Sequence, residues 1–102
     1  MVIGSKEQLE ESLSRTIRKK GYRKDLVREV MNQLGRVVER YQRGQETDVL
    51  PRTAIGSGIY TDNAQMLRRR GLLDIHYRGR HLFWEIWTVT PTEQCLELYS
   101  QE

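Results

Sequence analysis

The 102 residues of this chain are enough for one domain, and the sequence has no run of about 18 apolar residues that could cross a membrane. One cysteine excludes an internal disulfide framework, and the first residues lack the pattern of a signal peptide. We therefore expect a cytoplasmic protein with a single domain over residues 1–102 and no membrane partner. The net charge of +3 resides in residues 1–50, which hold 11 Lys and Arg against 8 Asp and Glu.

Residues 5–43 are predicted to form two helices separated by Gly21. Ser5 and Gln8 have the spacing of a capping box at the first helix start. The apolar stripe of that helix consists of Leu9, Leu13 and Ile17. The second helix, over residues 24–43, has the strongest periodicity in the chain, and its apolar residues recur at steps of three and four.

Cations are concentrated around the turn between these two helices. Asp25 is the only acid between Arg15 and Arg28. A phosphate-contacting patch and an ordinary solvated surface both have this composition. The candidate nucleic-acid contacts here are Lys19, Lys20, Arg23 and Lys24.

Residues 44–52 are polar and contain Pro51, so we predict a loop, with or without a single helical turn. A third helix is predicted to open at Ser57 or Thr61 and to end at Gly71. The outer face of this helix holds Asp62, Gln65, Arg68 and Arg69.

A β-hairpin is predicted next, with strands over residues 72–77 and 81–89 and a turn at Arg78-Gly79-Arg80. Apolar residues of the second strand fall on both faces. We therefore expect both faces to be at least partly covered, by a helix on one side and by a second subunit or a ligand on the other.

The last helix is predicted over residues 91–100, because Thr90 to Glu93 has the spacing of a capping box and Pro91 suits a first helical position. The apolar fraction of 37% leaves a small core, so a homodimer would add buried surface. The expected interface residues are Phe83, Trp84, Trp87, Leu96 and Tyr99.

Catalytic chemistry is not indicated. His76 and His81 straddle the predicted turn without a cysteine pair, which makes a weak metal site. The sequence has no phosphate-binding glycine loop with its lysine, and nothing in the spacing brings Ser57, Asp74 and His76 together. We expect no enzyme activity, no cofactor and no metal.

One pattern runs through the predicted third helix, the hairpin and the start of the last helix: Ile59, Tyr60, Leu67, Gly71, Leu72 and Leu73, then Arg78 to Arg80, then Val89 and Thr90. On these residues, about positions 57–92 of the chain resemble winged-helix transcription regulators of the PadR and MarR kind. The short helix that precedes the recognition helix in those families is not evident in residues 44–55. The resemblance implies an α+β, mainly α, winged-helix-like domain in the order helix-helix-loop-helix-strand-strand-helix.

The function that follows is duplex DNA binding by a small transcription regulator. Gln65, Arg68 and Arg69 would face the major groove, and Arg78 and Arg80 would contact the DNA backbone. One alternative is a protein-interaction module that docks a partner on the hairpin and binds no DNA. Another is RNA or single-strand binding, with hairpin aromatics stacked on bases.

Overall fold

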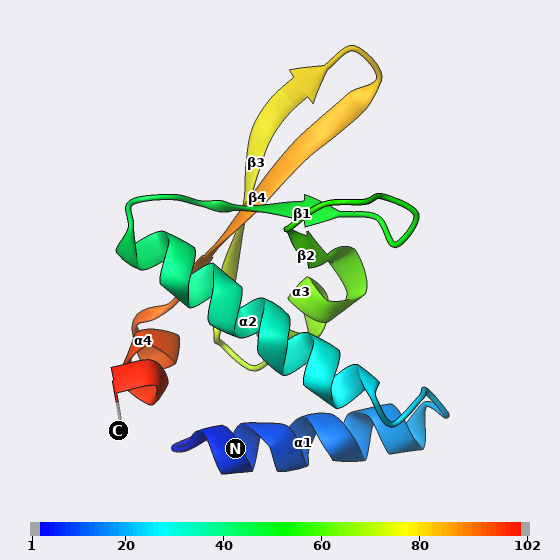
Figure 1. The fold of residues 1–102 in the computed structure, drawn as a ribbon, viewed down its shortest axis with the longest axis vertical. Helices are drawn as coiled ribbons and strands as arrows, with labels where there is room; N and C mark the ends of the chain where they lie inside the picture. The colour runs from blue at the N-terminus through cyan, green and yellow to red at the C-terminus, as the bar shows by residue number, and fades with distance from the viewer. Residues whose placement is uncertain (1–2, 101–102) are drawn as a thin grey trace.

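The longest helix, α2 (Leu26–Gln42), crosses the middle of the molecule in the computed structural model, which describes residues 3–100 (Figure 1). Helix α1 (Lys6–Lys19) packs beneath α2 through its predicted stripe of Leu9, Leu13 and Ile17. Ser5 caps α1 as predicted, since its Oγ accepts a hydrogen bond from the Gln8 N–H at 3.1 Å. The two predicted N-terminal helices are therefore confirmed, although α2 begins at Leu26 rather than Lys24.

Four strands form one mixed sheet in the order β2-β1-β4-β3. The strands are β1 (Thr47–Leu50), β2 (Ile59–Tyr60), β3 (Leu73–His81) and β4 (Trp84–Pro91). Strand β1 runs parallel to β2 and antiparallel to β4. The predicted loop over residues 44–52 is thus wrong in part, because residues 47–50 form β1. This strand has only four residues, too few for a recognisable alternation of apolar and polar side chains, and it is defined by pairing with β4, about 40 residues later.

A close backbone contact holds the edge of the sheet. Gly58 is buried just before β2, and a Cβ atom at this position would lie 2.3 Å from the main-chain oxygen of Asp48. Only glycine fits so near a neighbouring strand. Residues 59 and 60 form β2, and α3 (Thr61–Arg69) begins at Thr61, the second of its two predicted starts, rather than at Ser57.

The hairpin β3–β4 is confirmed, but the predicted turn is wrong. Strand β3 continues through Arg78 and Arg80, and the two-residue turn is Leu82-Phe83, between the paired residues His81 and Trp84. Gly79, with φ of +117°, adjoins a β-bulge instead. A bulge glycine and a turn glycine give the same local signal, which explains the error.

Helix α4 (Glu93–Ser100) begins two residues later than predicted. Thr92 is its capping residue, because its Oγ1 accepts a hydrogen bond from the Cys95 N–H at 3.3 Å. Pro91 ends β4, opposite Leu73, rather than opening the helix.

The fold is α+β, as expected, with close to half of its residues helical. Buried apolar residues of all four helices and of β2, β3 and β4 form one core cluster. Among residues 3–100, no helix is long and apolar enough to cross a membrane.

Candidate nucleic-acid interface

The first turn of α3 is held in place by Arg52, from the segment after β1. The Arg52 Nε–H donates to Asp62 Oδ2 at 2.9 Å, and its Nη2 donates to Glu29 Oε2, on α2, at 3.0 Å. The guanidinium also lies 4.7 Å from the centre of the Tyr60 ring. Asp62, expected on the outer face of the helix, is therefore neutralised by an arginine of the same chain.

Asn63 extends this network into the core and is fully buried. Its Nδ2 group donates to Glu29 Oε2 and to Gln33 Oε1, both at 2.9 Å. Gln33 Oε1 also accepts from the Tyr60 N–H at 3.2 Å. Burial opposes ionisation of Glu29, but the hydrogen bonds from Arg52 and Asn63 outweigh it and lower the pKa of the carboxyl. The network joins α2, β2 and α3 with its polar atoms satisfied.

A second arginine fixes the other end of α3. Arg70 reaches α1, where its Nη2 donates to Thr16 Oγ1 at 2.7 Å and its Nε–H donates to Ser12 Oγ at 3.0 Å. Its Nη1 donates to the Met66 main-chain oxygen at 2.9 Å. Burial, and then the nearby charge of Arg69, lower the pKa of Arg70. Arg52 and Arg70 thus anchor α3 to α2 and to α1.

The outward face of α3 carries the predicted Gln65, Arg68 and Arg69. Arg68 and Arg69 are exposed, and Gln65 is half-buried. Arg68 Nη1 lies 3.4 Å from Gln65 Oε1. No carboxylate of the described residues is within ion-pair distance of either arginine. Their charges are therefore available to an external anion.

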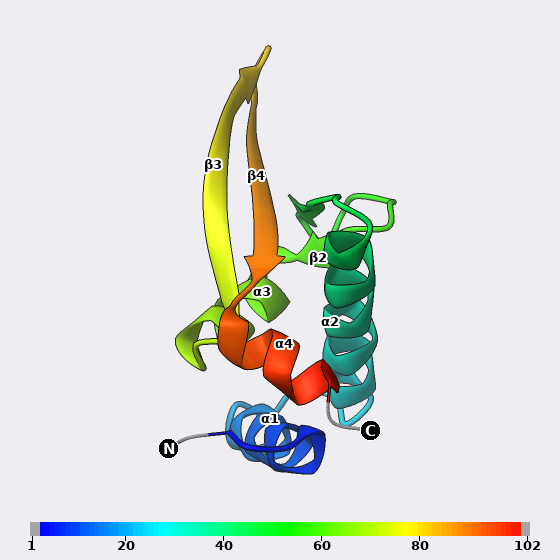
Figure 2. The same ribbon diagram turned by 90° about the vertical axis from the view of Figure 1, so that its left-hand side faces the viewer.

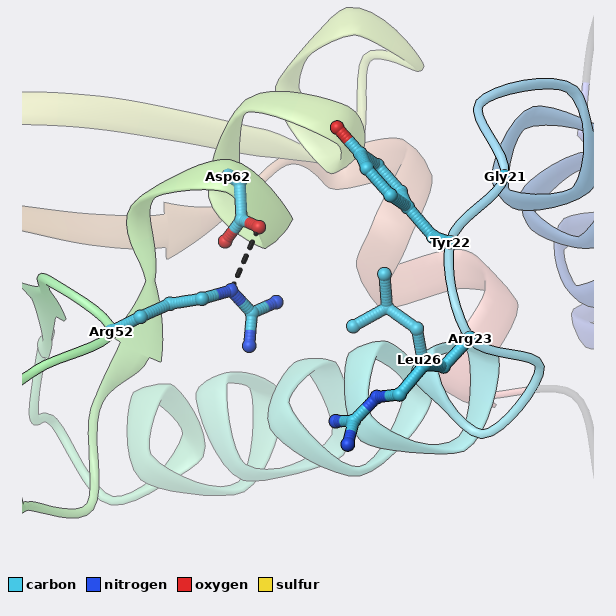
Figure 3. Close-up of a pocket in the computed structure, with 6 residues that line it drawn as sticks. All are labelled: Gly21, Tyr22, Arg23, Leu26, Arg52 and Asp62. Atoms are coloured by element: carbon cyan, nitrogen blue, oxygen red, sulfur yellow. Dashed lines mark hydrogen bonds and ion pairs between the residues drawn. The ribbon is translucent and has the colours of Figure 1, made fainter.

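The basic turn between α1 and α2 lies near the start of α3. Lys19, Lys20, Arg23 and Lys24 are all exposed. A hollow of about 410 Å³ separates this turn from the start of α3, with Tyr22, Arg23 and Leu26 on one side and the Arg52–Asp62 pair on the other (Figure 3). The structure thus places the basic turn across a depression from the start of α3, and Arg23 is the one predicted candidate among the residues that line it.

The two hairpin arginines lie elsewhere than predicted. Arg78 and Arg80 belong to β3 rather than to the turn. Arg78 forms an ion pair with Glu46, and its Nε–H donates to Glu46 Oε2 at 3.0 Å. Hydrogen bonds from Arg78 and then Thr88 lower the pKa of Glu46. Arg80 pairs with Glu85 at 3.7 Å across the hairpin.

The hairpin end is apolar and exposed, so the predicted cover by a helix is wrong for this part of the hairpin, while cover by a second subunit or a ligand stays a prediction. The turn and β4 expose Leu82, Phe83, Trp84, Ile86 and Trp87, and β3 exposes Tyr77. The rings of Tyr77 and Trp87 contact each other edge to face, with centroids 4.9 Å apart. Between this hairpin and α3 lies a groove of about 350 Å³ that Gln65, Glu85 and Trp87 help to line.

The remaining candidate residues pack inside the domain. Leu96 and Tyr99, expected at a subunit interface, lie half-buried against the core of their own chain, and burial raises the pKa of Tyr99 to about 12. Lys6 Nζ lies over the Tyr99 ring, 4.4 Å from its centroid. His76 Nε2 lies 2.8 Å from Thr90 Oγ1, and no group of three or more potential metal ligands occurs within residues 3–100.

The residues that position α3 were missed by sequence reasoning. Arg52, Asn63 and Arg70 carry no local motif, and the side chains with which they pair lie between 10 and 58 residues away. Comparison of the chain with protein-family models, with curated proteins and with solved structures finds no match.

Proposed function

We propose that this protein binds duplex DNA through α3, as a small transcription regulator. The observation that carries the proposal is that the arginines in and around α3 differ in whether the protein itself engages their charges. Arg52 and Arg70 have their charges and donors engaged inside the protein, whereas Arg68 and Arg69 point outward without a carboxylate partner among the described residues. A helix fixed at both ends presents its exposed donors in a defined geometry, as base-edge recognition requires.

The order of elements supports the same proposal. From α2 onward the chain forms β1 and β2, then α3, then the hairpin β3–β4, with β1 between β2 and β4. In winged-helix regulators a recognition helix is likewise followed at once by a hairpin. In this assignment α3 is the recognition helix and β3–β4 is the wing, while residues 51–58 replace the short preceding helix with irregular chain.

Cations of the α1–α2 turn supply the second contact. Lys19, Lys20 and Lys24 are exposed and have no ion pair with any described carboxylate. Lysines at the edge of a recognition helix neutralise phosphates without regard to sequence. Arg78 and Arg80 already have carboxylate partners, so we assign them a smaller share of the phosphate contacts.

The test is a fluorescence-anisotropy titration of generic duplex DNA with the wild-type chain and with the double variant Arg68→Ala/Arg69→Ala. We expect the variant to bind at least about tenfold more weakly, a loss of roughly 1.4 kcal/mol or more. The matched control is Arg15→Ala/Arg43→Ala, which also removes two exposed arginine charges, each paired with a glutamate four residues earlier. Equal losses in both variants would show a general charge effect and refute the role of α3.

A second candidate function is favoured by the exposed aromatic hairpin. In that case the protein is an interaction module that docks a different protein on Phe83, Trp84 and Trp87, and it binds no DNA. The same titration separates the two functions, because a docking module gives no salt-sensitive affinity for duplex DNA.

A further inference from the structure

The outer half of the hairpin projects from the fold as a two-stranded arm, formed by residues 77–87. Strand β1 pairs with β4 only at Val89 and Thr88, so no third strand supports the arm beyond that point. Figures 1 and 2 show it extending past the helices, at the end of the molecule opposite α1. An isolated two-stranded hairpin is only marginally stable in water.

The arm is apolar on both faces and at the tip. Phe83 is 95% exposed, Leu82 75% and Trp84 69%, while Tyr77, Ile86 and Trp87 are exposed to a lesser degree. At roughly 150–250 Å² for each aromatic side chain, these fractions leave on the order of 700 Å² of apolar surface in contact with water. That exceeds the few hundred Å² found on most soluble monomers.

The charges of the arm cancel. Arg80 and Glu85 face each other across its two strands, and the Arg78 guanidinium at its base is paired with Glu46. The arm therefore offers a polyanion little electrostatic attraction, unlike the turn between α1 and α2. If a two-fold axis passed between Arg80 and Glu85, Arg80 of one copy would lie beside Glu85 of the other. The two residues would then form opposite-charge contacts in both directions across the interface.

The tip has an unusual backbone. Leu82 has a φ of +56°, a left-handed conformation that glycine or asparagine adopts with less strain. A leucine held there, with its side chain three-quarters exposed, makes the turn less stable and the surface more apolar. Contact with an apolar partner would offset both costs.

From these observations we propose that the arm is a dimer interface and that its occupant is the arm of a second copy of this chain. The exposed apolar surface of about 700 Å² per copy lies on both faces and the tip, so a single contact would bury less than the roughly 800 Å² that each partner contributes to a standard interface. The neutral, self-complementary Arg80–Glu85 pair at its edge suits an isologous contact. This proposal does not depend on DNA binding.

The test is sedimentation equilibrium of the full chain between roughly 1 and 100 μM, the range in which a small, weak interface associates. We expect a mass of twice 12.1 kDa for the wild-type chain and 12.1 kDa for Phe83→Ser/Trp84→Ser. Tyr41→Ser/Ile55→Ser removes two exposed apolar side chains outside the arm and should leave the dimer intact.

Tryptophan fluorescence gives an independent readout, since Trp84 and Trp87 are the only tryptophans and both belong to the arm. Emission should shift to shorter wavelength as the wild-type chain is concentrated. A monomer at about 100 μM would overturn the proposal in favour of a different protein partner. A Phe83→Ser/Trp84→Ser variant that stays dimeric but loses duplex DNA binding would overturn it in favour of a DNA contact by the arm.

Discussion

Asn63 donates a hydrogen bond to Glu29 across 34 residues of sequence, at 2.9 Å, and so joins the first turn of α3 to the first half of α2. Asn63 is fully buried, and its loss removes one of the two donors that Glu29 Oε2 and Gln33 Oε1 each have, so that only Arg52 and the Tyr60 N–H remain. We expect Asn63→Ala to lower the free energy of unfolding by about 1–3 kcal/mol, measured by urea denaturation. Asn32→Ala, at an exposed position of α2, should change it by less than about 0.5 kcal/mol. Equal effects of the two substitutions would contradict the role of the network.

The lowered pKa of Glu29 predicts a loss of stability in acid. The folded-state pKa of this carboxyl lies below the ordinary value of 4.5, so the unfolded chain binds the proton more readily. The stabilisation is therefore complete above about pH 4.5 and is lost as the pH falls through the folded-state pKa. Unfolding free energies measured from pH 7 to 3 should decline less steeply for Glu29→Gln than for the exposed-site control Glu39→Gln. A Glu29→Gln curve with the same slope as the control would exclude Glu29 as a source of the decline.

Neighbouring arginines at the end of α3 should have opposite roles. Arg70 is engaged with α1, so Arg70→Ala should destabilise the fold by about 2–3 kcal/mol. Arg69 is exposed, so Arg69→Ala should change stability by less than about 0.5 kcal/mol while weakening DNA binding. Thermal unfolding and DNA titration of both variants check this separation. Loss of stability in Arg69→Ala would undermine the assignment of that side chain to an external ligand.

Two glycines should respond oppositely to alanine. In Gly58→Ala the new methyl group would meet the Asp48 main-chain oxygen, so we expect a loss of about 1–3 kcal/mol as β1 and β2 separate. Gly35 lies within α2 with open space around it, so Gly35→Ala should stabilise the protein by about 0.5–1 kcal/mol. Urea denaturation of the two variants measures both effects. Tolerance of alanine at Gly58 would argue against the close pairing of β1 with β2.

The elements that could be predicted from the sequence are those with local signals. The stripe of Leu9, Leu13 and Ile17 and the left-handed Gly71 specified α1 and the end of α3. Strand β1 could not be found this way, because it is defined by pairing with Thr88 and Val89. The turn was predicted at Gly79 rather than at Leu82-Phe83, because a β-bulge and a turn both favour glycine.

The candidate interface was predictable in composition but not in arrangement. Runs of Lys and Arg identified the α1–α2 turn and α3, since exposed cations need no partner within the chain. The distinction between Arg69, which is exposed, and Arg70, which is half-buried, depends on where α1 lies against α3. The pairing of Arg78 likewise depends on tertiary structure, because its partner Glu46 is 32 residues away.

The central claim is that α3 and the α1–α2 turn bind duplex DNA, and the salt dependence of binding tests it most directly. For the wild-type chain we expect micromolar affinity that falls with salt at a logarithmic slope of about −4 to −5, as roughly five phosphate contacts give. In Arg68→Ala/Arg69→Ala the slope should become shallower by up to about 2. Absence of binding by the wild-type chain at low salt, or an unchanged slope in the variant, would contradict the claim.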